Sequence, residues 1–140
     1  MTGVVAGNGT RSSTSLLRVR YAETDKMGVV YYANYFVWFE VARADLLRSL
    51  GWSYRDMEHA GVSLPVIDAQ CAYRRSVRYD DELEVRTEGR MLSPVRIEFT
   101  YQVVRREDQA LAASGRTVHA ALDASGKPCR LPDRVRQVFA

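Results

Sequence analysis

The sequence predicts an α+β domain in which one long helix packs against a curved antiparallel sheet of about five strands. Apolar residues recur at helical spacing over residues 34–50, and apolar and polar residues alternate strictly over 82–92 and 95–104. A chain of 140 residues is long enough to bury a core as one domain without disulfides or metals. The expected domain covers residues 15–140.

The predicted helix over residues 34–50 is apolar on nearly all sides. One face carries Tyr35, Trp38, Phe39, Ala42, Leu46 and Leu50. The opposite face carries Phe36, Val37, Val41, Ala44 and Leu47. A helix of this kind is normally buried on most sides, so the rest of the chain must wrap it. Asn34 is the expected N-cap, and Gly51 is the expected C-terminal stop.

One strand is expected before the helix and four after it. The expected strands cover residues 16–21, 62–73, 82–92, 95–104 and 110–122. Pro65 indicates an edge strand or a bulge in the second of them. Ser93 and Pro94 form a turn between the two alternating strands, which indicates an antiparallel hairpin. A short helix over residues 132–139 is expected to follow the last strand.

Residues 1–14 are small and polar, and are expected to form a disordered lead-in. They lack the basic start and apolar core of a secretory signal, and no apolar run in the chain has the length of a membrane span. Cys71 and Cys129 show no Cys-x-x-Cys spacing, so neither a zinc site nor a redox pair is indicated. Two free thiols favour a reducing compartment, and a cytoplasmic location is expected.

The net charge of +3 is mild, and part of the basic excess is concentrated at Arg74, Arg75 and Arg78. No basic stripe carries interleaved aromatic residues, so no nucleic-acid partner is expected. A modest positive patch also suits a ligand with several phosphates. For most of these side chains individually, a solvated surface position is the simpler interpretation.

Residues 21–35 read Tyr-Ala-Glu-Thr-Asp-Lys-Met-Gly-Val-Val-Tyr-Tyr-Ala-Asn-Tyr and lead directly into the predicted helix. This order can place Asp25 beside the free N–H groups of a helix N-terminus, which suit an oxyanion. A carboxylate that activates or attacks, together with such donors, is the minimum for acyl transfer. Taken alone, Asp25 is more simply interpreted as a turn residue.

The same segment resembles the active-site motif of the 4-hydroxybenzoyl-CoA thioesterase family of hotdog-fold acyl-CoA thioesterases. The resemblance implies the hotdog fold and hydrolysis of an acyl- or aroyl-CoA thioester to a free acid and CoA. It implies that Asp25 is the catalytic base or nucleophile, and that the main-chain N–H near Tyr32 polarises the thioester carbonyl. Coenzyme A is part of the substrate, and no metal or other cofactor is implied.

Many acyl-CoA members of the family carry histidine at the position of Tyr32, whereas the hydroxybenzoyl-CoA type carries tyrosine. A main-chain donor does not depend on that side chain, so the difference bears on substrate preference. The motif also implies substrate-site positions at Tyr21, Gly28, Val29, Tyr31, Ala33, Asn34 and Tyr35. Tyr21 is expected either to hydrogen-bond Asp25 or water, or to pack as a core tyrosine at the strand end. Tyr35 is expected mainly to pack.

Arg90, Ser93 and Arg96 flank the predicted hairpin and are candidates for contacts with the nucleotide end of CoA, because arginine and turn N–H groups suit phosphate. A solvated strand face is the alternative interpretation for each of them. Glu40 is a rival carboxylate, because a related hotdog branch uses an acidic residue on the central helix. The favoured interpretation of Glu40 is a surface pair with Arg43.

His59, expected in a loop, and His119, expected in the last strand, do not match the histidine position of hotdog dehydratases. Both histidines are therefore expected to be structural. Asp80 and Asp81 are interpreted as turn residues at the entry to a strand.

Two alternative functions remain open: hydrolysis of an acyl group on acyl carrier protein, and non-catalytic binding of an acyl thioester. A homo-oligomer, either a dimer or a tetramer, is expected, because a single sheet leaves edge strands and part of the helix uncovered. The resemblance implies active sites across a dimer interface. Phe36, Val37 and Trp38 are expected at that contact.

Overall fold

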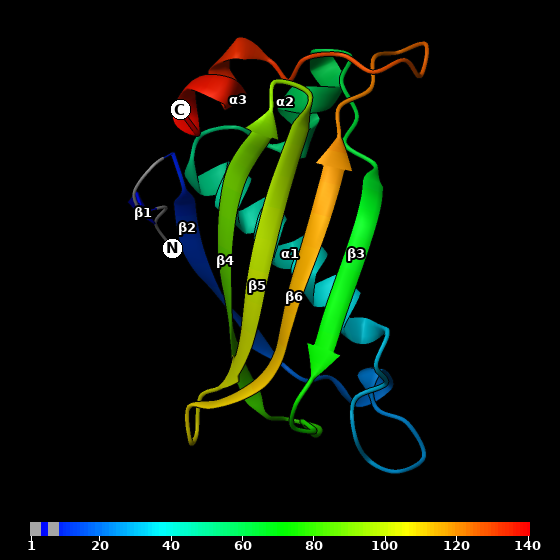
Figure 1. The fold of residues 1–140 in the computed structure, drawn as a ribbon. Helices are drawn as coiled ribbons and strands as arrows, with labels where there is room; N and C mark the ends of the chain where they lie inside the picture. The colour runs from blue at the N-terminus through cyan, green and yellow to red at the C-terminus, as the bar shows by residue number, and fades with distance from the viewer. Residues whose placement is uncertain (1–3, 6–8) are drawn as a thin grey trace.

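The computed structural model describes residues 4–5 and 9–140. A six-stranded antiparallel sheet in the order β1-β2-β4-β5-β6-β3 lies against one long helix, α1 (Asn34–Ser49), which crosses one face (Figure 1). The strands are β1 (Val4–Val5), β2 (Arg11–Arg18), β3 (Val66–Tyr73), β4 (Glu82–Ser93), β5 (Arg96–Arg105) and β6 (Ala110–Ala120). The predicted α+β class is confirmed.

The alternating segments form the centre of the sheet. On β4, Leu83, Val85 and Thr87 are buried against the helix side, while Arg86 and Glu88 are exposed. β4 and β5 pair in the register predicted for a hairpin, and the register shifts where the strands approach their turn. The period of two therefore predicted both the pairing and the buried face.

The buried face of α1 contains five of the six residues predicted for it; Leu50 is only partly buried, while Leu47, predicted on the opposite face, is buried. Val37 and Val41 on that opposite face are exposed in one chain, so the expected burial on most sides is not met there. The buried residues of α1 are Tyr35, Trp38, Phe39, Ala42, Leu46 and Leu47. The Phe39 ring stacks on Tyr101 of β5 with ring centroids 4.2 Å apart. Gly51 follows the helix with φ at 83°, the left-handed conformation that suits glycine at a helix end. The N-cap prediction is wrong: Ala33 is the cap, and the Asn34 side chain donates instead to the Glu23 carbonyl.

The first long strand begins earlier than predicted. Residues 11–14 were assigned to the disordered lead-in, but they pair with β4 as the first half of β2. Their small polar side chains gave no apolar signal, yet Ser13 and Ser15 are buried, and the Ser15 hydroxyl donates to Asp45 of α1 at 2.7 Å. β1 pairs with β2, and residues 1–3 and 6–8 of the predicted lead-in lie outside the described residues.

Shorter elements complete the chain. The strand predicted over residues 16–21 ends at Arg18, and Tyr21, its predicted last residue, instead begins the 3-10 helix η1 (Tyr21–Glu23). β3 starts only after Pro65 and lies at the edge of the sheet, as that proline indicated. The helix α2 (Tyr54–His59), capped by Ser53, was not predicted, and His59 lies in it rather than in a loop.

The predicted C-terminal helix is confirmed as α3 (Asp133–Val138), which adds Val135 to the core. In the described part of the chain, no helix has both the length and the apolar character needed to cross a membrane.

Candidate active site

Asp25 begins a tight loop whose ends are joined by backbone hydrogen bonds. The Asp25 N–H donates to the Val29 carbonyl at 2.8 Å, and the Gly28 N–H donates to the Asp25 carbonyl at 3.0 Å. Gly28 has φ at 80°, which glycine adopts without the steric cost of a side chain. The Met27 N–H donates to one oxygen of the exposed Asp25 carboxylate at 2.8 Å, so the loop backbone orients this side chain.

The chain enters α1 through a turn that leaves two amides without an acceptor. Asn34 N–H donates to the Tyr31 carbonyl at 3.0 Å, and Phe36 N–H donates to the Ala33 carbonyl at 3.2 Å. Among the described residues, the N–H groups of Tyr32 and Ala33 have no protein acceptor. Free N–H groups at the start of a long helix carry partial positive charge, which suits an oxygen that becomes negative during a reaction.

Glu23 joins the Asp25 loop to the first turn of α1. Its side chain is almost fully buried and accepts hydrogen bonds from Trp38 Nε1–H and from the Arg20 N–H, both at 2.8 Å. Its carbonyl accepts from the Tyr31 N–H and from the Asn34 side-chain amide, both at 2.9 Å. This role is not predictable from the sequence, because Trp38 and Asn34 reach Glu23 only once α1 is folded against the Asp25 loop.

A cavity of about 340 Å³, called the Asp25 cavity below, lies beside these groups. Its lining residues are Asp25, Val29, Val30, Tyr32, Tyr35, Tyr73, Arg74, Arg75 and Ser76. Tyr73 ends β3, and Arg74, Arg75 and Ser76 follow it. The Val30 N–H donates to the Val77 carbonyl at 3.0 Å, and this bond holds the segment after β3 against the Asp25 loop. The cavity is thus lined both by Asp25 and by Tyr32, the first of the two residues whose N–H groups have no acceptor among the described residues.

Residues 19–139 match the family described as the thioesterase-like superfamily. The chain belongs to this superfamily. It is 49% identical over 71 residues to a putative acyl-CoA thioesterase, YneP, of Bacillus subtilis, a match that spans about half of each chain (51% of both). It is 31% identical to the acyl-CoA thioester hydrolase YbgC of Escherichia coli O157:H7, over 88% of this chain and 92% of the relative.

Solved structures agree with this assignment. A DHNA-CoA thioesterase from Staphylococcus aureus superposes with a TM-score of 0.81 at 40% identity, covering 86% of this chain and 80% of that one. The hotdog fold expected from the motif is thus confirmed for this member of the thioesterase-like superfamily.

The predicted site residues of this thioesterase-family chain fall into two groups. Asp25, Val29, Tyr32 and Tyr35 line the Asp25 cavity. The remaining motif residues of the loop and helix start are its neighbours: Gly28, Tyr31, Ala33 and Asn34. Tyr35 is buried, as expected for a packing residue, and burial raises its pKa to about 12. Tyr21 is 77% exposed and contacts Tyr79 edge-on, so its interpretation as a core tyrosine is wrong.

Arg90, Ser93 and Arg96 lie around the β4–β5 turn, at the end of the sheet opposite to the Asp25 loop (Figure 1). One chain therefore does not bring them together with Asp25. Arg90 Nε–H donates to Glu98 Oε1 at 2.7 Å. Burial acts to raise the pKa of Glu98, but the hydrogen bonds from Arg90 and Arg116 outweigh it and hold that pKa below its usual value.

Arg74 and Arg75 form part of the wall of the Asp25 cavity. The sequence indicates them only as members of a basic cluster. Both side chains are exposed, and neither has a carboxylate partner among the described residues. Arg78 follows closely and lies beside Gly28 of the Asp25 loop. The sequence alone does not place Arg74, Arg75 and Arg78 at the site, because only the fold brings the end of β3 next to Asp25.

The rival residues have other surroundings. Glu40 is exposed on α1, and the expected pair with Arg43 is not formed, because Arg43 Nε–H donates to the Tyr54 hydroxyl at 3.1 Å. His119 is buried between the Leu64 carbonyl and the Thr117 hydroxyl, each 2.9 Å from one of its ring nitrogens. Neither histidine lines the Asp25 cavity, and the described residues contain no cluster of three His, Cys, Asp or Glu side chains that could hold a metal.

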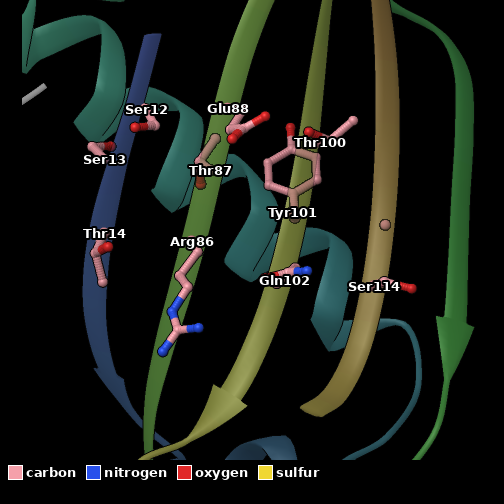
Figure 2. Close-up of a pocket in the computed structure, with 11 residues that line it drawn as sticks. Ser12, Ser13, Thr14, Arg86, Thr87, Glu88, Thr100, Tyr101, Gln102 and Ser114 are labelled. Atoms are coloured by element: carbon pink, nitrogen blue, oxygen red, sulfur yellow. The ribbon is translucent and has the colours of Figure 1, made fainter. Parts of the chain in front are cut away.

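A larger depression of about 750 Å³ lies on the outer face of the sheet, away from α1 (Figure 2). Side chains of β2, β4, β5 and β6 surround it, and they are mainly hydroxyl, amide and charged groups. Arg86, which is labelled there, donates to Glu84 at 3.0 Å. The depression has no helix terminus with free amides, so the Asp25 cavity is the better candidate for acyl-transfer chemistry.

Proposed function

We propose that this chain hydrolyses an acyl-CoA thioester to a free acid and CoA in the Asp25 cavity. The reaction class follows from its membership of the thioesterase-like superfamily, and the names of its relatives support acyl-CoA as the substrate. The observation that carries the proposal is that Asp25 and Tyr32 line one cavity, where the N–H groups of Tyr32 and of the next residue, Ala33, have no acceptor among the described residues.

In the proposed reaction, the thioester oxygen accepts hydrogen bonds from the Tyr32 and Ala33 N–H groups. Asp25 either removes a proton from a water molecule that attacks the carbonyl carbon, or attacks that carbon itself to form a mixed anhydride. In both routes the negative charge develops on the oxygen held by the amides, and the C–S bond then breaks. The CoA thiolate leaves and takes up a proton. In the first route the attacking water has already supplied the second oxygen of the acid; in the second route water hydrolyses the mixed anhydride, which releases the acid and restores the Asp25 carboxylate.

The basic wall of the cavity supports a substrate that carries phosphates. Arg74 and Arg75 line the cavity, and Arg78 lies beside Gly28 of the Asp25 loop. Guanidinium groups bind phosphate oxygens through paired N–H donors. Their side chains have no carboxylate partners among the described residues, so binding phosphate would not require an existing ion pair to break.

A second copy of the chain would complete the site. β3 is an edge strand with exposed Val66, Ile67 and Tyr73, and antiparallel pairing of two copies through β3 would cover it. Such a two-fold pairing turns the partner's β4–β5 turn toward the end of the sheet that carries Asp25. The predicted nucleotide contacts then come from Arg90, Ser93 and Arg96 of the partner subunit.

The homo-oligomer, either a dimer or a tetramer, thus remains part of the proposal, with one correction to its contact. Trp38, expected at the interface, is buried within the chain and donates to Glu23. Val37 and Val41 of α1 are exposed. The start of α1 passes behind β3 and β6 (Figure 1), so these two side chains, rather than Trp38, are the helix residues proposed for a contact next to the β3 edge.

The test is Asp25→Asn, which keeps the size of the side chain and removes its charge. We expect kcat for acyl-CoA hydrolysis to fall by about 10²–10⁴, the usual contribution of a positioned acid–base group. Glu40→Gln, on the exposed side of α1, is the matched control and should retain activity. Near-normal hydrolysis by Asp25→Asn, together with loss of activity in Glu40→Gln, would show that Glu40 on α1 is the catalytic carboxylate instead of Asp25. A panel of acyl- and aroyl-CoA substrates then defines the acyl preference.

The two alternatives give different results in the same assay. A carrier-protein substrate is also compatible with the basic wall, because acyl carrier proteins are acidic; inhibition by free CoA favours the CoA thioester instead. A non-catalytic binding protein would bind acyl-CoA without turnover even at high protein concentration.

A further inference from the structure

Tyr73, the last residue of β3, contacts the turn that leads into α1. Its hydroxyl donates a hydrogen bond to the carbonyl of Tyr32 at 2.9 Å. That carbonyl and the Ala33 N–H belong to one planar peptide group and point in opposite directions. A bond that fixes the oxygen therefore also fixes the direction of the N–H that faces the substrate.

The Tyr73 bond is the shorter of the two that this carbonyl accepts. The helix itself offers the Tyr35 N–H at 3.4 Å, which is longer than an ordinary N–H···O bond. Because hydrogen bonds in a chain polarise one another, a donor on the carbonyl also strengthens the N–H at the other end of the peptide. The Tyr73 hydroxyl thus provides the stronger of the two hydrogen bonds to the Tyr32 carbonyl, and the first turn of α1 provides the weaker one.

The surroundings hold the Tyr73 ring in this position. It packs edge-on against buried Tyr35, with ring centroids 5.1 Å apart, and against Tyr32 at 6.2 Å. Partial burial, followed by the hydrogen bond and charge of the neighbouring Cys71 and the charges of Tyr35 and Tyr32, raises the pKa of Tyr73, so its hydroxyl remains a protonated donor throughout the neutral range. The ring also lines the Asp25 cavity.

We infer that Tyr73 is a positioning residue, which orients and strengthens the Ala33 N–H, one of the two amide donors proposed to hold the thioester oxygen. The inference rests on the proposed function and adds one element to it. The edge strand β3, and not only the helix, determines the geometry of the oxyanion site.

Tyr73→Phe tests this role, because it keeps the ring contacts and removes only the hydroxyl. We expect kcat to fall about fivefold to tenfold, the range of one net hydrogen bond, while KM changes little. Tyr79→Phe, an exposed tyrosine outside the Asp25 cavity, is the matched control and should keep the wild-type kcat. Circular dichroism and the thermal midpoint verify that both variants fold.

A spectroscopic readout separates positioning from general stability. In the Asp25→Asn background, infrared spectra of a bound acyl-CoA should show the thioester C=O stretch moved to lower frequency by the amide donors. Adding Tyr73→Phe should reduce that shift. An unchanged kcat and an unchanged C=O frequency would overturn the inference, and so would a change confined to KM. Full activity of Asp25→Asn alone would instead reject the proposed function.

Discussion

At Tyr32, the main chain rather than the side chain is expected to act in catalysis. Its N–H has no acceptor in the described part of the chain, while its exposed ring packs against Tyr31. Tyr32→Phe should therefore keep most of the activity, whereas Tyr32→Pro should abolish it because proline has no N–H. Steady-state kinetics measure both, with circular dichroism to detect any loss of fold. Loss of activity in a well-folded Tyr32→Phe would assign the hydroxyl a direct role.

His119 should make the stability of the protein depend on pH. Burial, together with the nearby charge of Arg43, lowers its pKa from the ordinary histidine value of 6.5 to about 4, although the Leu64 carbonyl opposes this shift. Between pH 4 and 6.5, His119 is protonated in the unfolded chain but neutral in the folded chain. The contribution of His119 to the free energy of unfolding is therefore fully present above about pH 6.5 and is lost as the pH falls toward 4. The loss should reach roughly 3 kcal/mol at its limit.

Urea unfolding between pH 4 and 7 measures this effect. His119→Gln should flatten the profile in that window. His59→Gln, at an exposed position of α2, is the matched control and should leave it unchanged. An equal slope in wild type and His119→Gln would show that other groups cause the dependence.

At the level of single residues, sequence reasoning found the positions whose role depends on local order. Asp25 and Tyr32 belong to one short segment, so the motif was enough to place them at the same cavity. Tyr73 and Glu23 were missed, because the partners that give them a role, Tyr32 and Trp38, come from other elements. Arg43 is expected from helical spacing to pair with Glu40, but it bonds Tyr54 of another helix.

At the level of elements, the approach of α1 to the sheet depends on a glycine in β6. A Cβ on Gly115 would lie 2.4 Å from two ring carbons of Phe39, which is stacked on Tyr101 and cannot easily move. Gly115→Ala should therefore lower the free energy of unfolding by about 1–3 kcal/mol through overpacking. Thermal or urea unfolding measures it.

Ser114→Ala, next to Gly115 on the opposite face of β6, is the matched control and should change stability by less than about 0.5 kcal/mol. A Gly115→Ala variant as stable as the wild type would mean that the helix shifts without cost. This would contradict the tight contact between α1 and β6.

Elements with a strong period were predictable, and elements without one were not. The hairpin of β4 and β5 was found because every second residue faces α1. The first half of β2 was missed because residues 11–14 are polar, although Ser13 among them is buried. α2 was missed because six residues are too few to establish a helical period, although Ser53 and Asp56 form a recognisable capping box.

At the level of the whole molecule, the edge strand β3 is the feature that one chain leaves unsatisfied. Its backbone pairs with β6 on one side only, and Ile67 is exposed there. Pairing with a second copy would bury this edge, and a stable contact of that kind typically covers more than about 1,000 Å². We therefore expect light scattering at micromolar concentration to give a dimer or tetramer, and not the monomer mass of 15.9 kDa.

Ile67→Lys should break this assembly, because a charge on an edge strand opposes pairing with another chain. Leu16→Lys, an exposed position on β2 away from that edge, is the matched control and should leave the assembly intact. In Ile67→Lys we expect a smaller species and a raised KM for acyl-CoA, since the partner's contacts to the nucleotide end are lost. A wild-type protein that is stable and fully active as a monomer would refute the shared site, and Arg90, Ser93 and Arg96 would then have no route to the substrate.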